Sequence, residues 1–492
     1  MTKLGLPMLT ACLLTFAPAH AKDMNRASVV KIHVTRRGPD FMRPWTKAAP
    51  SELKATGVII RGKRILTNAH VVRYASRILV QAYESTDKIP AEVVAVAPGI
   101  DLAVLKLDED DFFKDRDALP LADKIPAIKE TVNVYGYPIG GDQMSITEGI
   151  ISRVEYASFY YGSRGLRIQV DAALNPGNSG GPAIADGRVV GLVFSGIRQA
   201  DGIGYLVSAE EIERFLKDVG DGAYDGKPTF LDGLQSTENE ALRAKLGLAE
   251  KTTGMLVSQP YIVDEKYPLR QWDVITHIGD KQIDNLGKVR VRDDLRLRFQ
   301  YYVPILATKG VVKLTIVRDK KKRVVDLPVG VERNMVLPYL KHDYPRYFII
   351  GPMVFLAASQ EFVSYDARWQ RYLSRLKSPL VARKFDRRRF KGEEIVVLGP
   401  RMFPHKITKG YGNSYFAVVT HVDGTTVKNL RHLAETLRDA TGDYVTLKFA
   451  GNYESLVFRR KALTASTEEI LADEGIRYRS SPDLRDVWKA AK

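Results

Sequence analysis

Cysteine and long apolar runs are the two features that this sequence most clearly lacks. It has one cysteine, Cys12, among 492 residues, so it can form no disulfide within the chain and has no zinc-finger cysteine pattern. Beyond residue 21 the best apolar run, residues 347–358, is shorter than the ~18 residues of a membrane-spanning helix and contains Gly351-Pro352. The sequence therefore predicts a soluble protein without a membrane span, and no pattern in it indicates a cofactor or a metal.

Acidic residues are fewer than basic ones, 58 against 74, which gives a formal net charge of +16. About +10 of this charge falls in residues 331–492. A basic surface can bind nucleic acid, anionic lipid or an acidic polymer. However, no stacking aromatics at RNA-motif spacing and no helix-turn-helix pattern accompany the charge. The sequence favours a solvated basic face and no nucleic-acid partner, and a polyanion-binding function rests on charge alone.

Residues 1–21 are interpreted as a signal peptide. Lys3 gives a positive start, residues 4–18 are apolar, and Ala19-His-Ala21 is a small-x-small cleavage site. This pattern predicts export, to the periplasm in a Gram-negative bacterium, and removal of Cys12 with the cleaved segment. Residues 9–12, Leu-Thr-Ala-Cys, also resemble a lipoprotein cleavage box, so lipoprotein processing stays open as an alternative.

The most informative segment is residues 171–182, which ends in Gly177-Asn-Ser-Gly-Gly-Pro182. A serine among glycines has backbone N–H groups that can face a developing oxyanion, which makes Ser179 a candidate nucleophile. A serine hydroxyl needs a base and an acid that orients the base. His70 ends a strand-like apolar run and Asp101 opens another, so we predict a His70–Asp101–Ser179 triad. The N–H groups of Gly177 and Ser179 are the predicted oxyanion donors.

The chain order His, Asp, Ser discriminates between two folds. Residues 177–181 also fit the G-x-S-x-G pattern of α/β-hydrolases, in which a helix, then Asp and His, follow the serine. Here residues 182–194 read as two β runs joined at Asp186-Gly187, which indicates a hairpin. The sequence thus favours a chymotrypsin-like double β-barrel over an α/β-hydrolase.

Three motifs carry a family resemblance: Thr67-Asn-Ala-His70, Asp101-Leu-Ala-Val104 and Gly177-Asn-Ser-Gly-Gly-Pro182. Together they resemble the catalytic blocks of the Deg/HtrA serine proteases, and residues 134–141 look most like the plant-type Deg branch with two PDZ-like domains. The resemblance implies a serine endopeptidase that cleaves unfolded or misfolded polypeptides in protein quality control. It also implies a homo-oligomer, a trimer or a hexamer. A peptide-binding chaperone or scaffold with low or conditional protease activity is the alternative.

The chymotrypsin-like fold further implies a primary substrate pocket. Its floor comes from the residue six before the nucleophile, here Ala173, and Ser195 and Gly196 are the other expected pocket residues. Because Ala173 offers no carboxylate to pair with Lys or Arg, we expect cleavage after small or medium apolar residues.

An internal repeat follows the protease region: residues 274–286 align without gaps to residues 418–430. The first copy resembles a PDZ domain, which binds peptide segments by strand addition near residues 231–234. The second copy, with its loop at residues 347–351, is more degenerate and favours a role in packing or assembly. The predicted architecture is mainly β: signal peptide 1–21, double-barrel protease 22–225, α+β PDZ domain 226–335, degenerate α+β PDZ-like domain 336–475 and C-terminal tail 476–492.

Overall fold

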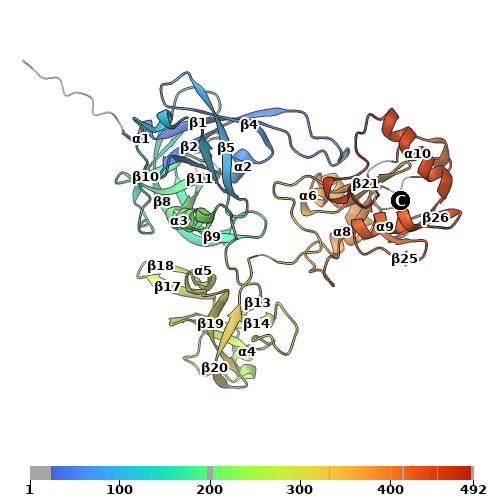
Figure 1. Ribbon diagram of the computed structural model, residues 1–492. Helices are drawn as coiled ribbons and strands as arrows, with labels where there is room; N and C mark the ends of the chain where they lie inside the picture. Colours follow the sequence, from blue (N-terminus) through green and yellow to red (C-terminus); the bar gives the residue numbers. More distant parts are fainter. Residues whose placement is uncertain are drawn as a thin grey trace, which may run out of the picture.

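Two closed β-barrels of six strands each form the N-terminal part of the computed structural model (Figure 1). The strand order is β1-β2-β3-β6-β5-β4 in the first barrel and β10-β11-β12-β9-β8-β7 in the second. The predicted mainly β fold with a double barrel is thereby confirmed. The structure describes residues 24–196, 203–331, 333–399, 402–412, 415–451 and 453–488, so the predicted signal peptide and Cys12 lie outside the described residues.

The first barrel is built from short strands whose alternate side chains point inward. In β1, Val30, Ile32 and Val34 all lie in its core, as the two-residue period of a strand requires. Its elements are α1 (Met24–Ala27), β1 (Val29–Arg36), β2 (Ser51–Ile60), β3 (Arg64–Thr67), α2 (Ala69–Val72), β4 (Ala75–Gln81), β5 (Lys88–Ala97), β6 (Leu102–Leu107) and η1 (Asp110–Phe113).

The second barrel contains the predicted hairpin at Asp186-Gly187. Both residues have positive φ, 47° and 70°, as a tight two-residue turn requires. A shared core that includes Val58 and Leu192 joins the two barrels. Its strands are β7 (Thr131–Gly136), β8 (Ser145–Ser158), β9 (Arg164–Asp171), β10 (Pro182–Ala185), β11 (Arg188–Gly196) and β12 (Gly204–Ser208).

Helix α3 (Ala209–Asp218) directly follows the last barrel strand, β12. The Ser208 hydroxyl caps it by accepting a hydrogen bond from the Glu211 N–H. Ile212 and Phe215 bury its apolar face in the shared core of the barrels, and η2 (Val219–Asp221) then ends the segment.

The unit that the sequence predicts to be a PDZ domain, here called the first PDZ-like unit, is a sheet in the order β13-β14-β15-β19-β20, with β16 paired to β15. It encloses a core around Ile275, Phe299 and Leu314. Its elements are β13 (Gly233–Ser236), α4 (Glu240–Leu246), β14 (Met255–Gln259), β15 (Val274–Ile278), β16 (Lys281–Gln282), β17 (Lys288–Arg292), β18 (Leu295–Arg298), η3 (Phe299–Tyr302), α5 (Val303–Leu306), β19 (Val311–Arg318) and β20 (Lys321–Pro328).

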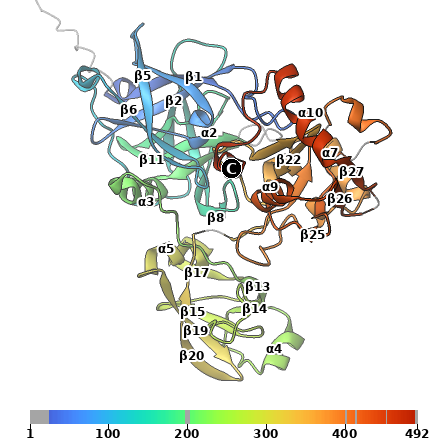
Figure 2. The ribbon, with the colours of Figure 1, turned by 45° about the vertical axis from the view of Figure 1, so that its right-hand side comes forward.

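The C-terminal unit combines a sheet β21-β22-β23 with a sheet β25-β24-β26-β27 (Figure 2). Leu484 and Val487 lie in its core. The predicted boundary at residue 475, between this domain and a C-terminal tail, therefore assigns two core side chains to the tail. Its elements are β21 (Tyr347–Ile350), β22 (Met353–Ala357), α6 (Gln360–Val363), α7 (Ala367–Arg375), α8 (Pro379–Ala382), β23 (Val396–Leu398), η4 (Lys406–Thr408), β24 (Val419–Val422), β25 (Thr425–Thr426), α9 (Leu430–Asp439), β26 (Tyr444–Phe449), β27 (Leu456–Arg459), α10 (Arg460–Asp473) and η5 (Pro482–Leu484).

The two units share a hairpin within the repeated segment. His277 pairs with Gln282 in the first copy, and His421 pairs with Thr426 at the corresponding positions of the second. Each copy also has a register shift just before this histidine in its pairing with the next strand, β19 or β26. The internal repeat is therefore confirmed at the level of backbone pairing.

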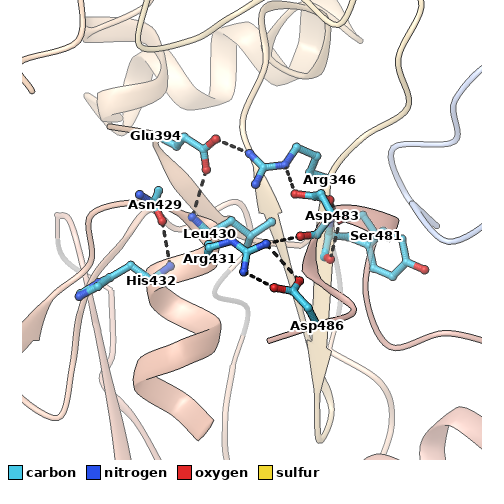
Figure 3. Close-up of polar contacts among 10 residues, drawn as sticks. Arg346, Glu394, Asn429, Leu430, Arg431, His432, Ser481, Asp483 and Asp486 are labelled. Atoms are coloured by element: carbon cyan, nitrogen blue, oxygen red, sulfur yellow. Dashed lines mark hydrogen bonds and ion pairs between the residues drawn. The ribbon is translucent and has the colours of Figure 1, made fainter. Parts of the chain in front are cut away.

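A polar network fastens the C-terminal segment to its unit (Figure 3). Arg346 pairs with Glu394 and, at 2.7 Å, with Asp483. Arg431, at the start of α9, pairs with Asp486 at 2.8 Å. Part of the positive charge of this half of the chain is thus used in ion pairs within the protein.

The loop between β1 and β2, residues 37–50, reaches from the first barrel to the C-terminal unit beside α6 (Figure 1). Phe41 is 5% exposed and packs against Phe362, with ring centroids 5.9 Å apart. Trp45 packs against Phe403, with ring centroids 5.4 Å apart. Among the described helices, none combines the length and the apolarity that crossing a bilayer takes.

Candidate active site

The first barrel brings His70 and Asp101 together. His70 lies in α2, which directly follows β3, and Asp101 directly precedes β6. Because β3 pairs antiparallel with β6, these two ends lie at the same edge of the barrel. His70 Nδ1 is 2.7 Å from Asp101 Oδ2, and the His70 N–H donates to Asp101 Oδ1 at 2.8 Å. The predicted base and orienting acid are thus joined by two hydrogen bonds.

Asp101 is buried in a conformation that fixes its carboxylate. The residue has a positive φ of 60°, which Asp tolerates better than most residues, and the Asn68 side-chain amide donates to its carbonyl oxygen at 3.0 Å. Burial raises the pKa of the Asp101 carboxyl, whereas the charge and hydrogen bonds of His70 act in the opposite direction. The carboxylate makes Nδ1 of His70 a donor, which leaves Nε2 for proton exchange with a substrate or a nucleophile.

Ser179 lies in the loop between β9 and β10, and this loop is held by its carbonyl groups. Four successive carbonyl oxygens each accept a hydrogen bond. The four pairs are Pro176 O with Ile139 N (2.8 Å), Gly177 O with Thr56 Oγ1 (2.8 Å), Asn178 O with Gly181 N (2.9 Å) and Ser179 O with Thr56 N (2.9 Å). Two of these four bonds come from one residue of the first barrel.

The N–H groups of the same loop fall into two kinds. Those of Asn178, Gly180 and Gly181 donate to backbone carbonyls of the protein. Those of Gly177 and Ser179 donate to no acceptor within the described residues. A backbone N–H close to buried structure is seldom left without a partner, so two such groups on one loop indicate an anion-binding position. They are the two groups that the sequence predicts as oxyanion donors.

The Ser179 loop meets the first barrel close to His70. A Cβ atom on Gly180 would lie 2.1 Å from Thr56 O and 2.4 Å from the Thr67 hydroxyl, three residues before His70. Within the described residues, no hydrogen bond joins the Ser179 hydroxyl to His70. Such bonds are often long without substrate and tighten when it binds. The structure therefore pairs the predicted base with the predicted acid and brings the Ser179 loop to the same barrel.

Of the expected pocket residues, one lies in this loop and two lie on β11. Ala173 is exposed in the segment after β9. Ser195 and Gly196 end β11, where their backbones pair with Tyr205 and Gly204 of β12. These positions neither support nor contradict the expected pocket, which stays a prediction. No group of three or more His, Cys, Asp or Glu side chains suited to a metal occurs in the part of the chain described.

Sequence reasoning missed Thr56. This residue is fully buried, and its hydroxyl contacts both the Ser179 loop and the Tyr137 N–H at the end of β7. One signal was available: Thr56 is the only polar side chain in the otherwise apolar run of residues 55–60. A lone hydroxyl in a buried strand requires a hydrogen-bond partner, although the sequence does not say which one.

Comparison with known proteins gives matches in both halves of the chain. The family model described as "Trypsin-like peptidase domain" matches residues 55–192, and that described as "PDZ domain" matches residues 336–483. The PDZ match thus falls on the copy that the sequence indicates to be more degenerate.

Named relatives match across most of the chain. "Protease Do-like 2, chloroplastic" of Arabidopsis thaliana is 30% identical over 466 residues, which cover 94% of this chain and 76% of the relative. "Protease Do-like 4, mitochondrial" of the same plant is 34% identical over 411 residues, covering 83% and 76%. Among solved structures, "HtrA-type protease AlgW with tripeptide" is 24% identical, with a TM-score of 0.49, and the match covers 62% of this chain and 94% of that one.

Proposed function

The chain belongs to the Do-like (Deg/HtrA) family of serine proteases and is a serine endopeptidase, and we propose that His70, Asp101 and Ser179 are its catalytic residues. The observation that carries this assignment is the His70–Asp101 pair, joined at 2.7 and 2.8 Å, with the Ser179 loop bound to the same barrel. In our proposal the N–H groups of Gly177 and Ser179 form the oxyanion hole.

The proposed reaction follows from these positions. His70 removes the hydroxyl proton of Ser179 as its Oγ attacks the peptide carbonyl, and Asp101 stabilises the imidazolium that forms. The two free N–H groups bind the oxyanion of the tetrahedral intermediate, and each such donor contributes about 3 kcal/mol in comparable sites. His70 then gives its proton to the leaving amine, and water releases the acyl group by the same steps in reverse order.

The test of this assignment is casein digestion by wild type, Ser179→Ala, His70→Ala and the double variant. Each single substitution should lower hydrolysis by several orders of magnitude, with little further loss in the double variant, because the residues act as a unit. All variants should show the wild-type thermal unfolding midpoint. Activity of Ser179→Ala within about tenfold of wild type would remove Ser179 from the nucleophile's role, because loss of a true nucleophile costs far more. An inactive wild type that still suppresses aggregation would support the chaperone or scaffold alternative.

We also propose unfolded polypeptides as substrates, delivered by the first PDZ-like unit. Strand β13 ends its sheet and is paired only with β14 within the described residues, so a peptide can add along its other edge. Deletion of residues 230–330 should reduce turnover of casein more than turnover of a short peptide, because a tethered site raises local substrate concentration. An unchanged ratio of the two rates would contradict the delivery role.

The proposed role of the C-terminal unit is assembly into a trimer or hexamer. Truncation after residue 335 should change the oligomer measured by light scattering while cleavage of a short peptide remains measurable. Truncation also uncovers Phe41 and Trp45. A second truncated protein therefore carries Phe41→Ser and Trp45→Ser, which prevent aggregation through the exposed rings. A truncated protein with the wild-type oligomer would contradict the assembly role.

Export to the periplasm rests on the sequence of residues 1–21 alone. The names of the relatives place them in chloroplasts and mitochondria and give this location no support. N-terminal sequencing of the secreted protein tests the proposal: cleavage after Ala21 is expected, and a lipid-modified start at Cys12 would establish the lipoprotein alternative.

A further inference from the structure

We propose that Thr56, in the first barrel, is a positioning residue that holds the oxyanion-binding loop in its active geometry. The inference rests on the proposed triad and adds to it a residue that does not touch the substrate. Its hydroxyl donates to Gly177 O at 2.8 Å, and its N–H donates to Ser179 O at 2.9 Å. The two carbonyls that Thr56 binds belong to the same two residues whose N–H groups donate to no acceptor in the described part of the chain.

All polar groups of Thr56 are engaged. Its hydroxyl also accepts a hydrogen bond from the Tyr137 N–H at 2.9 Å, and its carbonyl accepts one from the Thr67 hydroxyl at 2.8 Å. Thr56 is fully buried, so no water competes for these bonds. One hydroxyl thereby links β2, the end of β7 and the nucleophile loop.

The loop needs such an anchor because of Gly177. Glycine has the widest choice of backbone conformations, and Gly177 adopts a φ of 105° in which a Cβ atom would lie 2.3 Å from Tyr137 O. Hydrogen bonds from other parts of the chain are therefore needed to hold Gly177 in a single conformation. The Ile139 N–H donates to the carbonyl of Pro176, the residue before Gly177, and the Thr56 hydroxyl donates to the carbonyl of Gly177 itself. Since each peptide unit is planar and trans, the Ile139 bond to Pro176 O fixes the direction of the Gly177 N–H. The two Thr56 bonds fix the peptide units that follow Gly177 and Ser179, so each of these two residues is held on its C-terminal side.

The hydroxyl, rather than the bulk of the side chain, is the feature to test. Thr56→Val keeps the shape and removes both hydroxyl bonds, whereas Thr56→Ser keeps the hydroxyl. Thr237→Val is the matched control, because Thr237 is equally buried and its hydroxyl donates to Gly254 O at 2.7 Å in the first PDZ-like unit. For Thr56→Val we expect a kcat on a short peptide lower by about ten- to a hundredfold with KM nearly unchanged, as expected for misplaced catalytic groups. Thr56→Ser should regain most of this kcat, and Thr237→Val should match wild type.

Hydrogen–deuterium exchange, read by mass spectrometry over residues 174–182, gives a readout that needs no turnover. Exchange should be faster in Thr56→Val than in wild type, Thr56→Ser and Thr237→Val. Thr56→Ala replaces the valine variant if the latter does not fold. Unchanged exchange together with wild-type kcat in folded Thr56→Val would overturn the inference, as would an equal loss of kcat in Thr237→Val. If wild type shows no Ser179-dependent turnover, the proposed triad fails, while the exchange measurement still decides whether Thr56 holds the loop.

Discussion

The two halves of the proposed active site are built differently. In the first barrel, His70 and Asp101 satisfy each other through two direct hydrogen bonds between adjacent elements. In the second barrel, the N–H groups of Gly177 and Ser179 have no acceptor among the residues that the structure describes, and the Ser179 loop accepts two hydrogen bonds from Thr56 of the first barrel. The proposed acid–base pair is therefore complete within one barrel, whereas the proposed oxyanion-binding loop depends on contact between the two barrels.

The largest effect within this comparison is expected from Asp101→Asn. The change is nearly isosteric, and Asn tolerates the positive φ at this position. An asparagine favours the wrong tautomer of His70, so kcat should fall by about ten-thousand-fold. Peptide hydrolysis measures this loss, and the thermal unfolding midpoint should stay close to that of wild type. A loss below tenfold would mean that the pair in the first barrel does not orient the base.

A smaller loss of kcat is expected from Gly180→Ala, which changes only the Ser179 loop of the second barrel. Its Cβ would lie 2.1 Å from Thr56 O, at a φ of 84°, and would push the loop away from the first barrel. The kcat should fall by about a hundredfold, as for a catalytic group displaced by 1 Å. Gly187→Ala is the control, because Gly187 also has a positive φ but meets nothing within 4 Å. Equal losses in both variants would assign the effect to backbone strain instead of barrel contact.

The smallest effect on rate is expected from Ala173→Asp, which should alter the choice of substrate. Ala173 belongs to the segment that leads into the nucleophile loop, so the second barrel would set specificity while the first sets the base. Wild type should cleave unfolded casein after small or medium apolar residues, and the variant should gain cuts after Lys and Arg through charge pairing. Cleavage sites mapped by mass spectrometry decide this. A majority of wild-type cuts after Lys or Arg would contradict the expected pocket.

Local patterns in the sequence predicted much of this structure. They did not predict contacts between segments that are far apart in the chain. The turn at Asp186-Gly187 depends on neighbouring residues, whose preferences are visible in the sequence, and the repeat of residues 274–286 at 418–430 can be found by aligning the sequence with itself. The partner of Thr56 depends instead on how two barrels pack. In the same way, no periodic pattern indicated that Leu484 and Val487 complete a core.

The loop of residues 37–50 makes the molecule tolerant of a break in its backbone. Phe41 and Trp45 are held in the core of the C-terminal unit, and Tyr344 donates a hydrogen bond to Arg37 O at 2.7 Å. A single proteolytic nick in the connection after β20 would therefore leave two fragments bound to each other without a covalent link. They would elute together on native chromatography and separate only in denaturant, so self-cleavage at this place would escape any assay that follows the size of the folded protein.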